Sequence, residues 1–138
     1  MFLAFPLLAL PVLLYNLVVL TLTGGAQASE AADQLARPLL VAPMPSGGGL
    51  TVSLGDILLV VSLVVLFVEL MKATDSRRIA ILNHLLSMGV LVLCVAELLL
   101  LKGFATSVFL LISMMVLLDV LAGFVSTVTL SRGERGRR

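Results

Sequence analysis

Four long runs of apolar residues constrain this chain more than any other feature. They extend over residues 2–22, 54–71, 79–101 and 106–128, and their interiors are rich in Leu and Val. A helix that crosses a membrane needs about 20 such residues, because the hydrocarbon core is about 30 Å thick and each residue rises about 1.5 Å. The runs show no alternation of apolar and polar residues, which argues against the strands of a membrane barrel. The sequence therefore predicts an all-α integral membrane protein in which residues 1–138 form one transmembrane domain.

The composition agrees with a membrane protein and excludes other classes. Charged residues make up 12% of the chain and hydrophobic residues 60%, whereas an ordinary soluble domain carries about 25% charged residues. So few charges would not keep a folded domain in water, which excludes a soluble enzyme. The formal net charge of +1 is too small to attract nucleic acid, so we expect no nucleic-acid partner. The single cysteine, Cys94, cannot form a disulfide within the chain.

The first apolar run has two interpretations. The sequence Ala26-Gln27-Ala28 before Ser29 fits the small-residue pattern at which a signal peptide is cleaved. However, the run has no positively charged residues before it and is longer than the roughly 7–15 apolar residues of a signal peptide. We therefore expect a retained spanning helix over residues 2–22.

The segment between the first two runs, residues 24–53, differs from them in composition and is predicted to face outward. Glu30, Asp33 and Arg37 share one polar face at helical spacing, which predicts a short amphipathic helix over residues 29–40. Two prolines and three successive glycines then predict a loop.

Basic residues near the ends of the runs predict the orientation. The link at 72–78 and the tail at 131–138 hold most of them: Lys72, Arg77, Arg78, Arg132, Arg135, Arg137 and Arg138. Because basic loops stay in the cytoplasm, we expect both termini to be cytoplasmic, in a bacterial inner membrane. The basic tail is expected to contact anionic lipid. The links at 72–78 and 102–105 are short, so the four helices are predicted to form an antiparallel bundle.

Ionisable residues inside the apolar runs are the feature that lipid does not explain. A central Asp costs roughly 2.5 to 3.5 kcal/mol on insertion, whereas each Leu returns only about 0.3 to 0.6 kcal/mol. Such residues mark functional sites or interhelical contacts. The candidates for an intramembrane polar, ion or proton site are Asp119, Glu69, Glu97 and His84.

Some of these residues have simpler explanations as well. Glu69 lies three residues before Lys72 and can pair with it on one helix face, and Glu97 can pair with Lys102. Asp56, near the start of the second run, has the spacing of a capping box with Ser53.

Asp119 has no Lys or Arg at its depth in any apolar run. The alternatives for it are protonation, a bound cation, a second subunit, or a hydrogen bond to His84, Ser87, Asn16 or a backbone carbonyl.

Small residues near Asp119 predict a face for close helix packing. The predicted packing interface consists of Ala122, Gly123, Ser126, Thr127 and, from the first run, Asn16.

Two functions are consistent with these features, and neither is enzymatic. The sequence has no phosphate-binding loop, no metal-ligand cluster and no nucleophile with a nearby base, so we expect no cofactor and no metal site. The first hypothesis is an accessory or structural subunit of a membrane complex, or a homo-oligomer, packing through the fourth helix. The alternative is a small proton- or cation-coupled transporter or channel subunit that uses Asp119, Glu69 and Glu97 with His84.

Overall fold

The computed structural model describes residues 5–24, 27–72 and 77–135, and leaves the side chains of residues 77–80, 127 and 129–135 undescribed. The chain order of its elements is α1 (Ala9–Thr23), α2 (Ala28–Leu35), β1 (Pro38–Pro43), β2 (Gly49–Ser53), α3 (Leu54–Lys72), α4 (Arg77–Leu100), the 3₁₀ helix η2 (Lys102–Phe104) and α5 (Ser107–Arg135).

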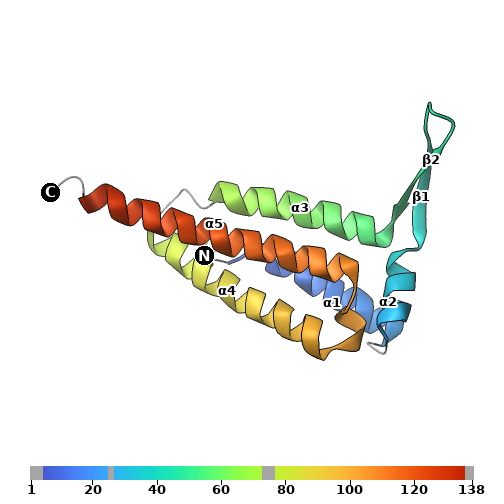
Figure 1. Cartoon of the computed structure of the whole chain (residues 1–138), viewed down its shortest axis with the longest axis horizontal. Helices are drawn as coiled ribbons and strands as arrows, with labels where there is room; N and C mark the ends of the chain where they lie inside the picture. Colours follow the sequence, from blue (N-terminus) through green and yellow to red (C-terminus); the bar gives the residue numbers. More distant parts are fainter. Residues whose placement is uncertain (1–4, 25–26, 73–76, 136–138) are drawn as a thin grey trace.

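The long helices run side by side, and α5 lies between α3 and α4 (Figure 1). The helices α1 and α4 run in one direction and α3 and α5 in the other (Figure 1). We call the end where α3 and α5 finish and α4 begins the basic end. The opposite end, which holds α2, η2 and the strands, is called the hairpin end. The all-α, antiparallel arrangement predicted from the sequence is therefore confirmed.

Three helices are long and apolar enough to cross a membrane: Leu54–Lys72, Ile81–Leu100 and Ser107–Ser126. The helix α1 has 15 residues, about 22 Å at 1.5 Å per residue, which is shorter than the hydrocarbon core. Together with α2, to which it is bent by 107°, it meets the same criteria as a broken span. Among the described residues there are thus three candidate spans, and a fourth only if this bent pair counts as one.

The first predicted helix is wrong at its start. Residues 5–8 precede α1 and form turns, with the amides of Ala9 and Leu10 donating to the carbonyls of Pro6 and Leu7. Pro11 then lies in the first turn of α1. Backbone N–H groups in a first turn have no acceptor within the helix, so proline costs no helical hydrogen bond there. The predicted residues 2–4 lie outside the described part of the chain.

The segment predicted to face outward contains a hairpin that the sequence did not predict. The amphipathic helix is present but ends at Leu35, and residues 38–40, predicted as helix, belong to β1. β1 and β2 pair antiparallel around a turn in which Gly47 has a φ of +85°. The predicted loop therefore includes the ends of two strands.

The predicted second and third helices agree with α3 and α4 to within two residues, whereas the fourth was predicted too short. α5 continues to Arg135, so residues 131–135 of the predicted tail are helical and residues 136–138 lie outside the described part. At the start of α3, the Ser53 amide and hydroxyl donate to Asp56 Oδ2 at 2.8 and 2.7 Å, and the Asp56 amide donates to Ser53 Oγ at 3.2 Å. These bonds confirm the capping box.

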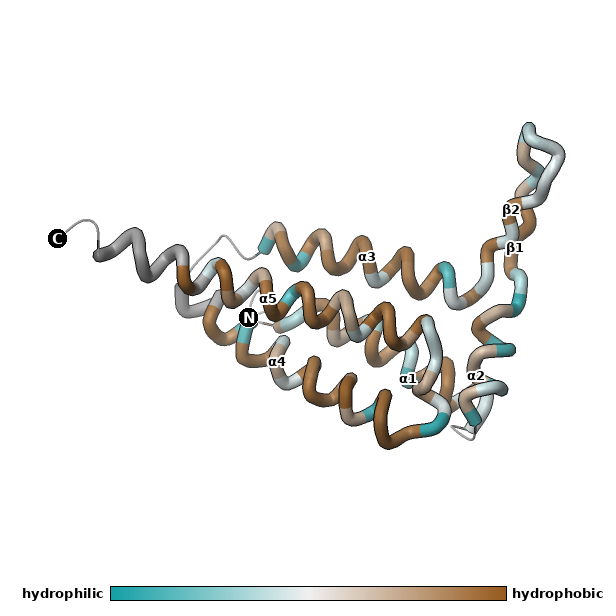
Figure 2. The backbone as a smooth tube through the Cα atoms, viewed as in Figure 1, coloured by the Kyte–Doolittle hydropathy of each residue, from teal (hydrophilic) through white to brown (hydrophobic). Residues whose placement is uncertain are grey.

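Aromatic rings hold the bundle together at the hairpin end. Tyr15, Phe104 and Phe109 are buried, with ring centroids 4.7 to 5.5 Å apart. The Tyr15 hydroxyl also shares a hydrogen bond of 2.5 Å with Thr106 Oγ1. This cluster joins α1 to η2 and α5. The helices are largely hydrophobic along their length (Figure 2), and many of their large apolar side chains are exposed, as expected for helices surrounded by lipid.

Candidate functional site: a polar cluster between the helices

Glu69, near the end of α3, has hydrogen bonds to two other segments of the chain. It is 1% exposed. Its Oε2 accepts a hydrogen bond of 3.0 Å from the Leu7 amide and lies 3.5 Å from Lys72 Nζ. Its Oε1 accepts a hydrogen bond of 2.5 Å from Asn83 Nδ2 on α4. The carboxylate therefore joins the segment before α1, α3 and α4, and its predicted pairing with Lys72 is confirmed.

Lys72 also connects two parts of the chain. Its Nζ donates to the Phe5 carbonyl at 2.9 Å in addition to its contact with Glu69. The ammonium group lies near the surface while Glu69 is enclosed, with side-chain exposures of 15% and 0%. A cation that reaches the interface while its partner stays buried is the arrangement expected of a Lys near a membrane boundary.

Asp119 is buried within the chain, with 7% exposure. Ser87 Oγ of α4 donates to its Oδ2 at 2.6 Å. Of the hydrogen-bond partners that the sequence suggested for Asp119, Ser87 is thus the one that bonds to it. Asp119 thus joins α5 to α4 inside this chain, which agrees with the Ser87 alternative given by the sequence and not with a contact to a second subunit.

His84 fits closely against the small residues of α5. A Cβ atom built on Gly123 would lie only 2.7 Å from His84 Nδ1, so the glycine makes room for the ring. Ala122 and Gly123 of the predicted packing face are half-buried, and Ser126 donates to the Ala122 carbonyl at 3.0 Å. The side chain of Thr127 lies outside the described part.

Two buried polar atoms in this region have no hydrogen-bond partner among the described residues: Asn83 Oδ1 and His84 Nδ1. A buried polar group without a partner is costly, more so in a membrane. Asn83 bonds to Glu69 through its other amide atom, and His84 Nδ1 lies against Gly123. We define the inner polar cluster as Glu69, Lys72, Asn83, His84, Ser87 and Asp119.

Glu97 is separate from this cluster. Its Oε2 accepts a hydrogen bond of 3.2 Å from Asn16 Nδ2 of α1, and Asn16 also donates to the Val12 carbonyl at 3.1 Å. The partner of Glu97 is thus Asn16 and not the predicted Lys102. Asn16 joins α1 to α4, which is a contact between helices of the same chain.

The inner polar cluster brings together three of the four ionisable candidates from the sequence, Glu69, His84 and Asp119, and adds Lys72, Asn83 and Ser87. Asn83 and Ser87 supply the bonds to Glu69 and Asp119. In the sequence, Asn83 and Ser87 stand out as polar residues about one and two turns into an apolar run. Asn83 is one residue from His84 and four residues from Ser87, and a spacing of four brings two side chains to the same face of a helix. Within the described residues, no group of three or more His, Cys, Asp or Glu side chains is arranged to hold a metal ion. Chemically, the cluster can hold two carboxyl groups in a region of low polarity and accept or donate hydrogen bonds around them.

Comparison of the chain with protein-family models, with curated proteins and with solved structures returned no match. The functional argument therefore rests on the residues described above.

Proposed function

We propose that this chain is a small, non-enzymatic membrane protein that acts as an accessory or structural subunit of a larger membrane complex, or as a homo-oligomer. The observation that carries the proposal is the outer face of α5. Its large apolar side chains are about half exposed at alternating spacings of three and four residues: Leu111, Met114, Leu118, Leu121 and Val125.

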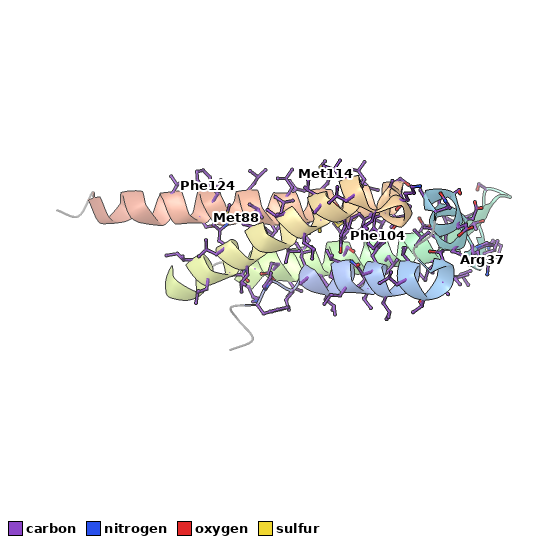
Figure 3. The ribbon with its side chains drawn as sticks, turned by 90° about the horizontal axis from the view of Figure 1, so that it is seen from below. Arg37, Met88, Phe104, Met114 and Phe124 are labelled. Atoms are coloured by element: carbon purple, nitrogen blue, oxygen red, sulfur yellow. The ribbon has the colours of Figure 1, made fainter. Side chains whose placement is uncertain are left out.

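The position of α5 makes this face a suitable contact. The helix is held on both sides by α3 and α4, so a partner on its open side would bind a rigid surface. Figure 3 shows Met114 and Phe124 pointing away from the other helices. Spacings of three and four residues are those at which one helix packs along another. The fourth predicted helix thus remains the proposed contact, through its apolar outer face and not through Asp119.

The proposed location is a bacterial inner membrane with the basic end in the cytoplasm. In support, α3 ends at Lys72, α4 begins at Arg77 and α5 ends at Arg135, all at one end of the bundle (Figure 1). Positive charge concentrated at one end favours that end as cytoplasmic, and the C-terminal arginines are proposed to contact anionic lipid.

A photoreactive amino acid at position 118 tests the subunit proposal. Leu118 is 55% exposed on the outer face of α5, and Leu63 on α3, 57% exposed, is the matched control. We expect irradiation of native membranes to attach the Leu118 variant to a protein and the Leu63 variant to lipid only. The mass of the adduct separates a second copy from a different subunit. Capture of lipid alone at position 118, and equally at 114 and 121, would contradict a protein contact on this face.

A second candidate function is a proton- or cation-coupled transporter or channel subunit. The observation that favours it is the inner polar cluster, where Glu69, His84 and Asp119 come from three helices and two buried polar atoms lack partners. Carboxyl groups within a membrane span commonly belong to ion or proton pathways.

Purified protein in liposomes with an internal pH or cation indicator tests this second function. Asp119→Asn keeps an oxygen that can accept the Ser87 hydrogen bond but removes the acid. If the chain conducts, we expect flux to fall at least tenfold in Asp119→Asn and to remain unchanged in Asp56→Asn, whose carboxylate caps α3. Absence of flux in the unmodified protein, or flux that Asp119→Asn leaves intact, would remove the transport candidate.

A further inference from the structure

The β1–β2 hairpin is an apolar element that lies outside the helical bundle. From residue 38 to residue 55 the chain carries no charged side chain. Leu39, Leu40, Val41, Met44 and Leu50 are each 44% to 60% exposed. An isolated two-stranded hairpin is marginally stable in water, and exposed apolar residues in such a segment indicate a surface that contacts something else.

The strand register makes one face of the hairpin apolar throughout, whereas the other face includes Thr51 and Gly49. Leu40 lies opposite Val52, and Ala42 opposite Leu50. Since alternate residues of a strand share a face, these four side chains form one face that is apolar throughout. The other face pairs Val41 with Thr51 and Pro43 with Gly49. We call the first of these the Leu40 face.

The length of α3 sets the depth at which the hairpin leaves the bundle. α3 begins at Leu54, directly after β2, and has 19 residues. At about 1.5 Å per residue it is about 28 Å long, so a membrane-spanning α3 uses its whole length to cross a hydrocarbon core of about 30 Å. Its first residue therefore lies at the edge of the core, and β2 ends at the same level.

The direction of the hairpin keeps its strands near the edge of the hydrocarbon core. It runs across the bundle axis and projects beyond α3, away from the other helices (Figure 1). α3 follows the hairpin directly and has exposed apolar side chains in its first two turns, at Ile57 and Val60. In a spanning bundle the molecules beside this surface are lipids. Its base is flanked by exposed charged residues, Arg37 and Asp56 (Figure 3 labels Arg37).

We propose that the hairpin is an interfacial anchor that rests on the outer leaflet of the bilayer, with the Leu40 face toward the acyl chains. The proposal rests on the membrane location given under the proposed function. Lipid is favoured over a second copy of the chain because the hairpin offers no charged group to select a protein partner, and because it is continuous with the apolar outer surface of α3. Its unpaired strand edges require water or headgroups, which places it at the interface and not within the core.

Tryptophan fluorescence tests this anchor, because the chain has no native tryptophan. The variants are Leu40→Trp and Leu50→Trp on the Leu40 face, Val41→Trp on the opposite face and Leu63→Trp on α3. Each position is exposed, so none of these changes fills a packed site. The proteins are placed in phosphatidylcholine vesicles that contain lipids brominated either high or low on the acyl chain.

We expect blue-shifted emission from positions 40 and 50, with at least a twofold loss of intensity in lipid brominated near the headgroup. We expect Val41→Trp to emit at longer wavelength with less quenching. Emission from positions 40 and 50 at the wavelength of water-exposed Trp would overturn the anchor. Blue-shifted emission that brominated lipid does not quench, and that grows with the protein-to-lipid ratio, would assign the face to a second copy and overturn it also. Leu63→Trp separates this failure from failure of the membrane location, because it is quenched whenever α3 spans the bilayer.

Discussion

Replacing Glu69 with Leu is expected to destabilise the protein by about 3 kcal/mol, the largest effect of any single change considered for this chain. The buried carboxylate accepts hydrogen bonds from the Leu7 amide and Asn83 and lies beside Lys72. Leucine supplies no acceptor for any of them, which leaves an amide and a side-chain amide unpaired in a region of low polarity. Unfolding by SDS in mixed micelles measures the loss.

Glu30→Leu is the matched control for this change. Glu30 is exposed on α2, so its loss is expected to alter stability by less than about 0.5 kcal/mol. Glu69→Gln retains one carbonyl oxygen and is expected to fall between the wild type and Glu69→Leu. If Glu69→Leu unfolds at the same SDS fraction as the wild type, Glu69 does not hold the basic end together, and a role in transport becomes its better explanation.

Replacing Gly123 with Ala is expected to cost about 1–3 kcal/mol, the range for overfilling a packed site. The added methyl group would lie 2.7 Å from His84 Nδ1, so the imidazole or the whole of α4 must move. Gly89→Ala is the control on α4, because a Cβ there meets nothing within 4 Å. Alanine favours a helix over glycine by about 0.8–1.0 kcal/mol, so Gly89→Ala is expected to stabilise the protein. The two identical substitutions should therefore shift SDS unfolding in opposite directions.

A double mutant identifies the cause of the Gly123 effect. If the clash with His84 is responsible, adding His84→Ala to Gly123→Ala should recover most of the lost stability, a coupling that a double-mutant cycle measures. Equal and additive losses in the two single mutants would show instead that Gly123 matters for another reason, such as the backbone of α5.

The elements that the sequence predicted well are those set by local chemistry. The apolar run that became α3 and the Ser53–Asp56 capping box depend on residues close together in the chain. The pairing of Glu69 with Lys72 could be predicted for the same reason, since three residues along a helix bring two side chains to one face.

The contacts that the sequence left open or missed join residues that are distant along the chain. Ser87 and Asp119 are 32 residues apart, and the sequence does not fix how α4 and α5 are rotated toward each other. Asn16 and Glu97 are 81 residues apart, so Lys102 was preferred because it is nearer. The hairpin was obscured by Pro43 and Pro45, which indicate a loop by local rules although Pro43 stands at the end of β1.

The two ends of the bundle are held by different kinds of force, and so they respond to different conditions. Tyr15, Phe104 and Phe109 meet through dispersion and apolar burial, which acid or salt changes little. The basic end depends on hydrogen bonds to the buried Glu69 carboxylate and on its contact with Lys72, which are electrostatic interactions. We therefore expect the loss of a polar group at the basic end to loosen that end while the aromatic cluster stays packed.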